Sequence, residues 1–260
     1  MQQEIFGQLS NAFFVHCGQQ WQGLGPVAIT GISNSNPCVV TAPNHGFSNG
    51  IEVNIVDVLG MTQINQDASQ AYTISGVTTN TFQLVGMDST GFGIYAGGGI
   101  VKQVANEVTG MSYLLGQQVT AVGDGALILP PTIVTADAVN LPYHANLITI
   151  GIPYGVTIQP TNPTLSSQSG TTRGMKQKLD RVTLSLYQSM GGQFGTDPAH
   201  MYDITYGPGT MAQQPQMSTL EVTRDMDCDW TDESTFYITQ SDPFPFTLRG
   251  LVWRMDVNQD

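Results

Sequence analysis

Charged side chains are scarce in this sequence. They make up 11 % of the 260 residues, where globular proteins usually have about 25 %. Only eight residues are Lys or Arg and twenty are Asp or Glu, which gives a formal net charge of −12. A surface with so few cations has no basic field to attract phosphates or anionic lipid headgroups. We therefore expect neither tight nucleic-acid binding nor membrane anchoring by this chain.

Long apolar runs and paired cysteines are also missing. No hydrophobic stretch approaches the roughly 20 residues that a membrane-spanning helix needs. The first 14 residues contain Glu4 and no basic residue, which is unlike a secretory signal. The three cysteines, Cys17, Cys38 and Cys228, form no CxxC pair. We expect them to be reduced thiols in a protein made in a cytosol.

The sequence motifs of common active sites are absent as well. There is no GxSxG nucleophile elbow and no GxxxxGK[ST] phosphate loop. The four histidines stand apart, without the i, i+2 or i, i+4 spacing that places two imidazoles on one metal ion. His45, in Asn44-His45-Gly46-Phe47, is predicted to stabilise a tight turn. We therefore expect no catalytic residue, no cofactor and no enzymatic activity.

The sequence is rich in the pattern of β-strands. Over 182–187, Val and Leu alternate with Thr, Ser and Tyr, the period of a strand with one buried face. Thr78-Thr79-Asn80 and Asp124-Gly125 are predicted hairpin turns. Short strands at close intervals predict an all-β, mainly antiparallel fold of the sandwich or small-barrel type. The other predicted strands are 71–77, 81–86, 146–152, 235–239 and 247–255.

One basic segment departs from the strand pattern. Residues 173–180 are predicted to form a short helix with Thr171 or Thr172 as its N-cap. Basic side chains near the end of such a helix would interact favourably with its dipole. Four cations within nine residues also form a candidate protein–protein contact, whereas the net charge opposes a phosphate backbone as partner. These candidate interface residues are Arg173, Lys176, Lys178 and Arg181.

An acidic run near residue 227 superficially resembles the start of a calcium loop. Asp225, Asp227 and Asp229 alternate as the first EF-hand ligands do. The EF-hand pattern then requires Gly and Glu, but Trp230 and Phe236 stand at those positions. An irregular calcium site built from these three aspartates stays an alternative to a solvated acidic loop, which we favour.

The segment 242–246 reads Asp-Pro-Phe-Pro-Phe. Its two prolines lack N–H donors, so it cannot lie in the centre of a sheet and is predicted to be an extended edge. Alternate residues of an extended chain face the same side, so Phe244 and Phe246 are expected to bury together. They either close the core of their own domain or dock on a neighbouring subunit.

Residues 28–103 carry an ordered set of features that resembles a small β-domain called FCCH-like. The name comes from the first catalytic-cysteine half-domain of ubiquitin-activating enzymes, and the module is common in phage tail proteins. The resemblance implies no ubiquitin chemistry, because Cys38 has no basic partner to activate it. The matching features are Ile29-Thr30, Asn36-Pro37, Val39-Val40-Thr41, His45-Gly46-Phe47, Gly50, Gly60-Met61, Asn65, Thr81-Phe82, Asp88-Ser89-Thr90-Gly91-Phe92 and Gly97-Gly98.

Two domains are expected from this resemblance. Residues 27–103 are expected to form a small, barrel-like FCCH-like domain. It would be inserted into a β-sandwich-like domain built from 1–26 and 104–260, because a different strand pattern lies on either side of the matching stretch.

The flanking sequence is similar to the C-terminal part of phage tail nozzle proteins, also called tail tubular protein B. Such proteins usually carry a much larger N-terminal region. The similar segments are FVHCGQQWQG (14–23), VTGMSYLLGQQVTAVGDG (108–125), ITIGIPY (148–154), GMKQKLDRVTLSLYQS (174–189) and QSDPFPFT (240–247).

The second resemblance implies a structural protein of the virion tail. Its copies would form a homo-oligomeric ring beside other tail proteins, and genomic DNA would pass through the ring without tight binding. The resemblance allows a hexamer, but the number of subunits is left open. An acidic lining is consistent with this role because it repels phosphates.

A receptor- or carbohydrate-binding β-module at the tail tip is the alternative. Trp21, Trp230 and tyrosines in loops could stack on sugars. That function requires two or three exposed aromatic rings converging on one face, whereas tail assembly requires an extended self-complementary surface.

Overall fold

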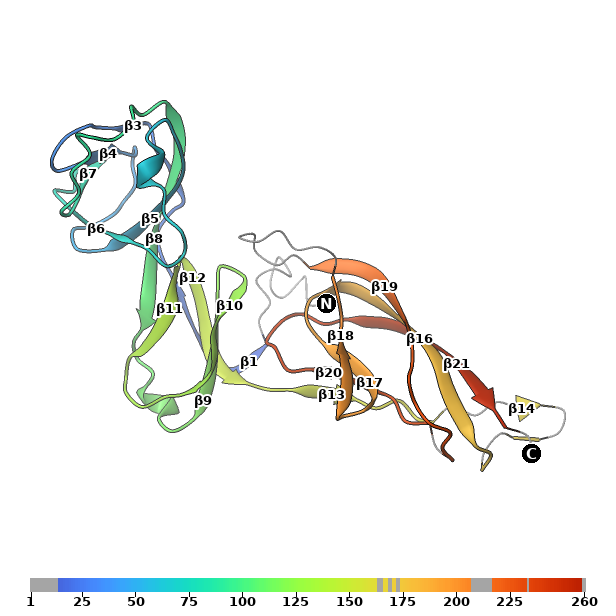
Figure 1. Cartoon of the computed structure of the whole chain (residues 1–260). Helices are drawn as coiled ribbons and strands as arrows, with labels where there is room; N and C mark the ends of the chain where they lie inside the picture. The colour runs from blue at the N-terminus through green and yellow to red at the C-terminus, as the bar shows by residue number, and fades with distance from the viewer. Residues whose placement is uncertain are drawn as a thin grey trace. The chain divides into compact units, whose positions relative to one another are not determined.

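A computed structural model describes residues 14–162, 166–167, 170–171, 174–206, 217–232 and 234–258. The fold is all-β and mainly antiparallel, as predicted, and the only helical elements in the described ranges are two short 3-10 turns (Figure 1). Contacts divide the chain into unit 1 (Met1–His16 with Pro153–Asp260) and unit 2 (Cys17–Ile152). Within the described ranges, no helix is long and apolar enough to cross a membrane.

The larger sheet of unit 2 has eight strands in the order β11-β8-β5-β6-β7-β4-β3, with β2 beside β8. The strands of residues 27–101 surround one core that includes Cys38, Ile55 and Phe82, whereas β11 and the end of β8 contribute to a second core. The ladders of the described residues do not close, so the barrel-like form expected for 27–103 is corrected to an open sheet. The strands are β2 (Val27–Ala28), β3 (Gly31–Ile32), β4 (Val39–Thr41), β5 (Glu52–Leu59), β6 (Tyr72–Ser75), β7 (Thr81–Leu84), β8 (Gly97–Val108) and β11 (Val139–Ala145).

A second sheet of four strands has the order β1-β12-β9-β10. Its bounds are β1 (Val15–Gln22), β12 (Leu147–Pro153), β9 (Gln118–Gly123) and β10 (Ala126–Ile133). A separate core lies here, with Met111, Ile148 and Ile150 fully buried and Trp21 packed against it. The 3-10 turn η3 (Ser112–Leu114) contributes to this core, whereas η2 (Thr62–Ile64) contributes to the first.

The compact units do not follow the expected domain boundaries. The core of residues 29–101 lies inside the expected insertion. Residues 104–152, however, group with that insertion in unit 2 rather than with 153–260. The reason is β8, whose first part pairs with β5 and whose last residues pair with β11. One continuous strand therefore serves both cores of unit 2.

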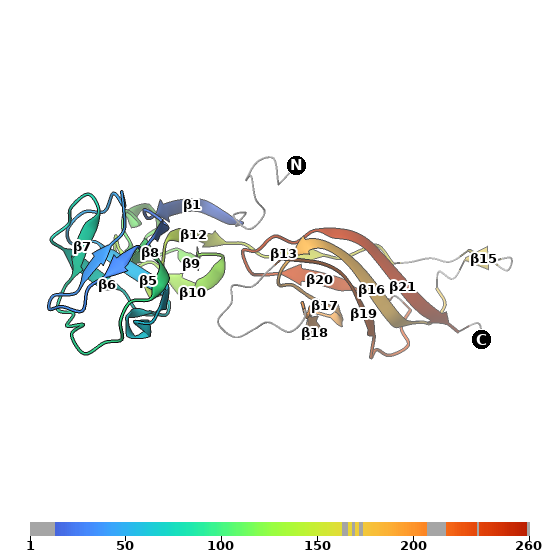
Figure 2. The same ribbon diagram turned by 90° about the horizontal axis from the view of Figure 1, so that it is seen from above.

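Unit 1 contains a β-sandwich-like arrangement. Leu184 of β16 shares a core with Phe194 of β17 and Ile238 of β20, which belong to a different sheet. The long strands β16 and β21 run side by side (Figure 2). One sheet is β13 (Val156–Ile158), β20 (Tyr237–Gln240), β17 (Gln193–Asp197) and β18 (His200–Asp203); the next is β19 (Ser218–Asp225), β16 (Gln177–Ser189) and β21 (Leu248–Val257); a third pairs β14 (Ser166–Ser167) with β15 (Gly170–Thr171).

The short helix predicted over 173–180 is wrong. β16 begins at Gln177 and already pairs with Val257 of β21 at that residue. Gln177 and Leu179 are buried while Lys178 is half-buried, so burial alternates here too. The phase differs from that of 182–187 because the pairing with β21 shifts between Leu179 and Arg181. Pairing and burial of a strand override the local capping and charge signals that favoured a helix.

The turn predictions are confirmed. β6 and β7 pair as a hairpin around residues 78–80. Asp124 and Gly125 have φ angles of 48° and 83° between β9 and β10, as a two-residue hairpin of this type requires. His45 is buried, and its Nδ1 accepts the N–H of Phe47 at 2.9 Å. The turn residues thus act through local hydrogen bonds and positive φ.

Candidate functional site

An apolar cavity of about 210 Å³ lies beside the Pro-Phe-Pro-Phe segment in unit 1. Residues 242–244 bend instead of running fully extended as predicted. Phe244 and Phe246 nevertheless line the same cavity, so the structure brings the two candidate interface rings together. The cavity is lined by Phe14, Tyr154, Val156, Ile158, Ile238, Gln240, Asp242, Phe244 and Phe246.

Backbone carbonyls fix this segment although its prolines cannot donate hydrogen bonds. The carbonyl oxygens of Pro243 and Pro245 accept the N–H groups of Phe14 and Met190, both at 3.0 Å. The side chain of Gln240 donates to the Met190 carbonyl at 2.7 Å. The segment is therefore fixed through hydrogen bonds to its carbonyl oxygens. Such bonds can order a proline-rich stretch beside a sheet although proline has no N–H donor.

The two phenylalanines differ in their surroundings. Phe244 is only 8 % exposed, while Phe246 is half-buried and packs against the core of unit 1. Gly192 lies so close that a Cβ there would be 2.7 Å from Cε2 of Phe246, and its φ of 93° also favours glycine. Both rings thus contribute to the packing of unit 1. A contact with a neighbouring subunit would have to be made at the open part of the cavity.

The basic segment lies along a strand rather than on a helix. Lys178 and Arg181 belong to β16, Lys176 precedes it, and Arg173 lies outside the described residues. Nε of Arg181 donates to Oδ1 of Asp225 at 2.6 Å across the ladder. This pair raises the pKa of Arg181 and lowers that of Asp225. The charge of Arg181 is therefore partly compensated within the sheet.

The three aspartates of the calcium alternative do not come together. Asp225 is engaged by Arg181, whereas Asp227 and Asp229 are exposed and line a polar cavity of about 590 Å³. Across the part of the chain that the structure describes, no three His, Cys, Asp or Glu side chains gather closely enough to hold a metal ion. The described residues therefore provide no cluster of ligands for the calcium alternative, and the acidic loop stays the favoured interpretation.

Cys38 lies in the core of the larger sheet of unit 2 and is fully buried. Its Sγ donates to the carbonyl oxygen of Ser33 at 3.7 Å. Burial raises the pKa of the Cys38 thiol, and a hydrogen bond with Ser89 offsets only part of that rise. A buried thiol with a raised pKa is protonated at neutral pH and is a poor nucleophile.

We expect thiol reagents to distinguish the three cysteines in the native protein. Cys17 is exposed and Cys228 is half-buried, so DTNB should modify Cys17 first and Cys228 more slowly. Cys38 should react only after unfolding, because its thiol is inaccessible and its pKa is raised. Peptide mass mapping assigns the modified sites. Modification of native Cys38 at the rate of Cys17 would contradict this description.

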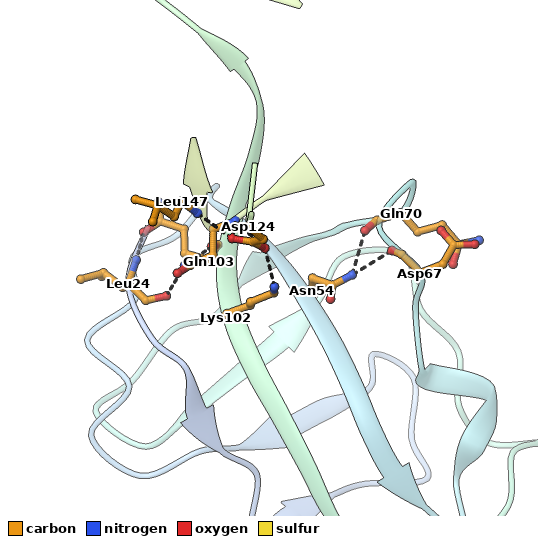
Figure 3. Close-up of polar contacts among 9 residues, drawn as sticks. Leu24, Asn54, Asp67, Gln70, Lys102, Gln103, Asp124 and Leu147 are labelled. Carbon is orange, nitrogen blue, oxygen red and sulfur yellow. Dashed lines mark hydrogen bonds and ion pairs between the residues drawn. The ribbon is translucent and has the colours of Figure 1, made fainter. Parts of the chain in front are cut away.

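A network of polar contacts joins the two cores of unit 2 (Figure 3). Nζ of Lys102 on β8 lies 2.7 Å from Oδ2 of Asp124 in the β9–β10 turn. The same carboxylate accepts the N–H of Asn146 at 3.2 Å and the N–H of Leu147 at 2.9 Å. Asp124 therefore ties the β9–β10 turn to two other segments, β8 and residues 146–147. We call these contacts the β8 joint.

The chain also crosses β8 at residues 23–25, where it completes the β8 joint. The N–H of Leu24 donates to Oε1 of Gln103 at 3.0 Å, and the N–H of Gln103 donates to the Leu24 carbonyl at 2.9 Å. Nδ2 of Asn146 donates to the Gln103 carbonyl at 2.7 Å. A Cβ at Gly23 would lie 2.5 Å from that carbonyl oxygen, so only glycine permits this approach.

Sequence reasoning missed the β8 joint. Two signals for it are present in the sequence. Lys102 is the single Lys or Arg between residues 17 and 152, and Asp124 stands in a predicted Asp-Gly turn. A lone cation among acidic residues favours an ion pair, but the sequence does not say which carboxylate it meets.

The open sheet and single core of residues 29–101 define a small β-domain of unit 2. Residues 35–105 match a family described as the ubiquitin-activating enzyme E1 FCCH domain. This part of the chain is therefore similar to FCCH domains, as the sequence features predicted. No curated protein matches the chain.

Proposed function

We propose that this chain is a structural component of a phage virion tail, part of a nozzle or tail-tube ring that forms the DNA ejection conduit. The observation that carries the proposal is the FCCH-like match over residues 35–105, since this module is common in phage tail proteins. The all-β architecture with several open sheets supports it, because edge strands and faces can be covered by neighbouring subunits. In this proposal the chain is not an enzyme and acts in the virion, beside other tail proteins.

The charge distribution supports a conduit wall. The net charge is −12, and Lys102, the one Lys or Arg of unit 2, is paired with Asp124. Phosphates of passing DNA would therefore meet an acidic surface, which repels them and lets the duplex slide.

We expect the purified chain to show no measurable binding of duplex DNA at about 150 mM salt. The net charge of −12 opposes phosphates, and Arg181 is partly neutralised by Asp225. Fluorescence anisotropy of a labelled duplex measures this directly. A micromolar complex would show that the basic segment near residue 178 outweighs the acidic remainder.

The alternative, receptor or carbohydrate binding, finds less support. Trp21 is half-buried against a core, the hydroxyl of Tyr113 donates to the Cys17 carbonyl, and Arg249 covers the ring of Tyr187. Trp230 is 45 % exposed. Among the described residues, the observed ring pairs include none of the exposed tyrosines or Trp230. A stacking platform for sugars needs several such rings together.

The experiment that tests the proposal is localisation of this chain in purified virions by electron microscopy, with a tail ring as the expected result.

A further inference from the structure

The three-stranded sheet of unit 1 has two long, regular edges. Within the described residues, β19 and β21 each pair with the central strand β16 alone. Residues 181–186 of β16 pair without a shift with 220–225 of β19, and residues 181–185 pair without a shift with 250–254 of β21. Both edge strands therefore keep an unshifted register with β16 over residues 181–185. Such edges present unpaired N–H and C=O groups to any strand that can add to them.

The two edge strands run in the same direction, because both are antiparallel to β16 (Figure 1). A second copy can therefore continue the sheet by placing its β19 beside β21 of the first copy, in parallel and with the same faces aligned. This contact is head-to-tail, so each copy keeps one free edge of each kind for the next copy. Repetition of a head-to-tail contact gives a ring when the rotation closes.

Opposite charges lie at the two edges of the outer face, next to the rows that pair without a shift. β21 exposes Arg249 and Arg254, whereas β19 exposes Glu221 and Asp225. β21 also exposes Asp256, but its partner Lys178 lies beyond the register shift, and Arg224 of β19 lies over the ring of Tyr202 on the core side of the sheet. Arg254 and Asp225 both pair with Arg181 and so lie in one row. Gly250, next to Arg249, and Glu221 both pair with Ser185. An unstaggered continuation therefore places Arg254 of one copy in the row of Asp225 of the next. Arg249 is the extra residue of the register shift between Gly250 and Leu248, and it lies one residue along the strand from the row of Glu221.

Two of these four charges already have partners within one copy. Arg254 pairs with Asp180, and Asp225 pairs with Arg181. Arg249 lies over the ring of Tyr187, 5.8 Å from its centroid. For the Glu221 side chain, the described residues provide neither a hydrogen bond nor an ion pair. Arg249 and Glu221 are therefore the charges best placed to pair between copies.

We propose that β21 of one copy pairs with β19 of a second copy of this chain, with Arg249 beside Glu221, and that this contact builds the ring. The inference rests on the proposed function, and it specifies the surface through which the copies of the ring contact one another. Charge also disfavours the wrong pairings, because two β21 edges would bring arginines together and two β19 edges would bring carboxylates together. Val252 is 68 % exposed at the centre of the β21 edge. Opposite Thr223 of the next copy it would gain the contact between β-branched side chains that sheets favour.

A charge exchange tests the pairing of Arg249 with Glu221. Arg249→Glu and Glu221→Arg should each weaken assembly of the full chain by about tenfold or more, because like charges then face each other. The double variant should restore it, because the pair is re-formed with its signs exchanged. Mass photometry and sedimentation velocity give the oligomer mass, and circular dichroism checks that each variant is folded. Thr219→Arg, at another exposed position of β19, is the matched control and should retain more assembly than Glu221→Arg.

Cysteine cross-linking tests the strand contact itself. In a Cys17→Ser background, Val252→Cys and Thr223→Cys together should give a ladder of disulfide-linked oligomers under mild oxidation. Within one copy the two positions are separated by β16, about two strand spacings or roughly 9.6 Å, which is too far for an intramolecular disulfide. Each single variant should give no ladder.

The outcomes separate this inference from the proposed function. A ladder together with charge-exchange rescue supports the edge contact. Rings without a ladder, or rings unaffected by both single charge reversals, overturn the edge contact and leave the tail function standing. A full chain that stays monomeric at about 100 μM, far above the micromolar range of a typical specific contact, contradicts the edge contact and the ring together.

Discussion

Replacing both Phe244 and Phe246 by Ser is expected to destabilise unit 1 severely. Truncation of a buried phenylalanine costs about 3–5 kcal/mol, and Phe244 is only 8 % exposed. Phe246 is half-buried and packs against Gly192, so its share is expected to be smaller. Urea unfolding of the full chain measures the loss, with Tyr143→Ser, at an exposed aromatic residue of unit 2, as control.

Each outcome of this double substitution has a separate meaning. A large loss of stability shows that the two rings close the core of their own unit. An unchanged unfolding midpoint with failed assembly would instead establish that they dock on a neighbouring subunit. If stability and assembly both survive, the segment is only a rigid linker, and the cavity beside it has neither role.

Asp124→Ala is expected to cost unit 2 about 4 kcal/mol or more. The carboxylate accepts the N–H groups of Asn146 and Leu147 and pairs with Lys102, and hydrogen bonds to a charged group contribute about 1.5–3 kcal/mol each. Alanine is also disfavoured at the φ of 48° found here, by about 1–2 kcal/mol. Urea unfolding measures the total, and hydrogen exchange at Asn146 and Leu147 reports the local loss.

Two milder variants show which contact of the β8 joint matters. Asp124→Asn keeps an acceptor and tolerates positive φ, so we expect a loss of about 1 kcal/mol. Lys102→Met removes an ion pair whose side chains are 29 % and 35 % exposed, so we expect a loss below about 1 kcal/mol. If Lys102→Met were as damaging as Asp124→Ala, the ion pair rather than the backbone hydrogen bonds would hold the joint.

The strands could be predicted because their burial alternates with the sequence. The run over 182–187 and the Asp124-Gly125 turn carry their own local signals, and both are confirmed. The prediction of a helix over 173–180 was wrong because it rested on local capping and charge patterns. The pairing of β16 with β21, which those patterns do not reveal, makes the segment a strand. Local sequence patterns therefore predicted a strand or turn correctly where the strand pairing of the fold favours the same structure.

The sites were less predictable than the strands because they depend on register. Lys102 and Asp124 are 22 residues apart, and nothing in their spacing indicates that they meet. The nearness of Arg249 to the row of Glu221 appears only once Glu221 and Gly250, the neighbour of Arg249, are both aligned to Ser185 through β16. Phe244 and Phe246 could be identified from the sequence because two prolines mark their segment. The bend of that segment was not predicted.

Electron microscopy of purified virions tests the central proposal most directly. At a resolution that traces side chains, we predict density for this chain as a closed ring of identical copies around the tail channel. The β19 edge of each copy should meet the β21 edge of the next. Absence of the chain from the tail, or its presence only as isolated copies at a receptor-binding tip, would contradict the proposal.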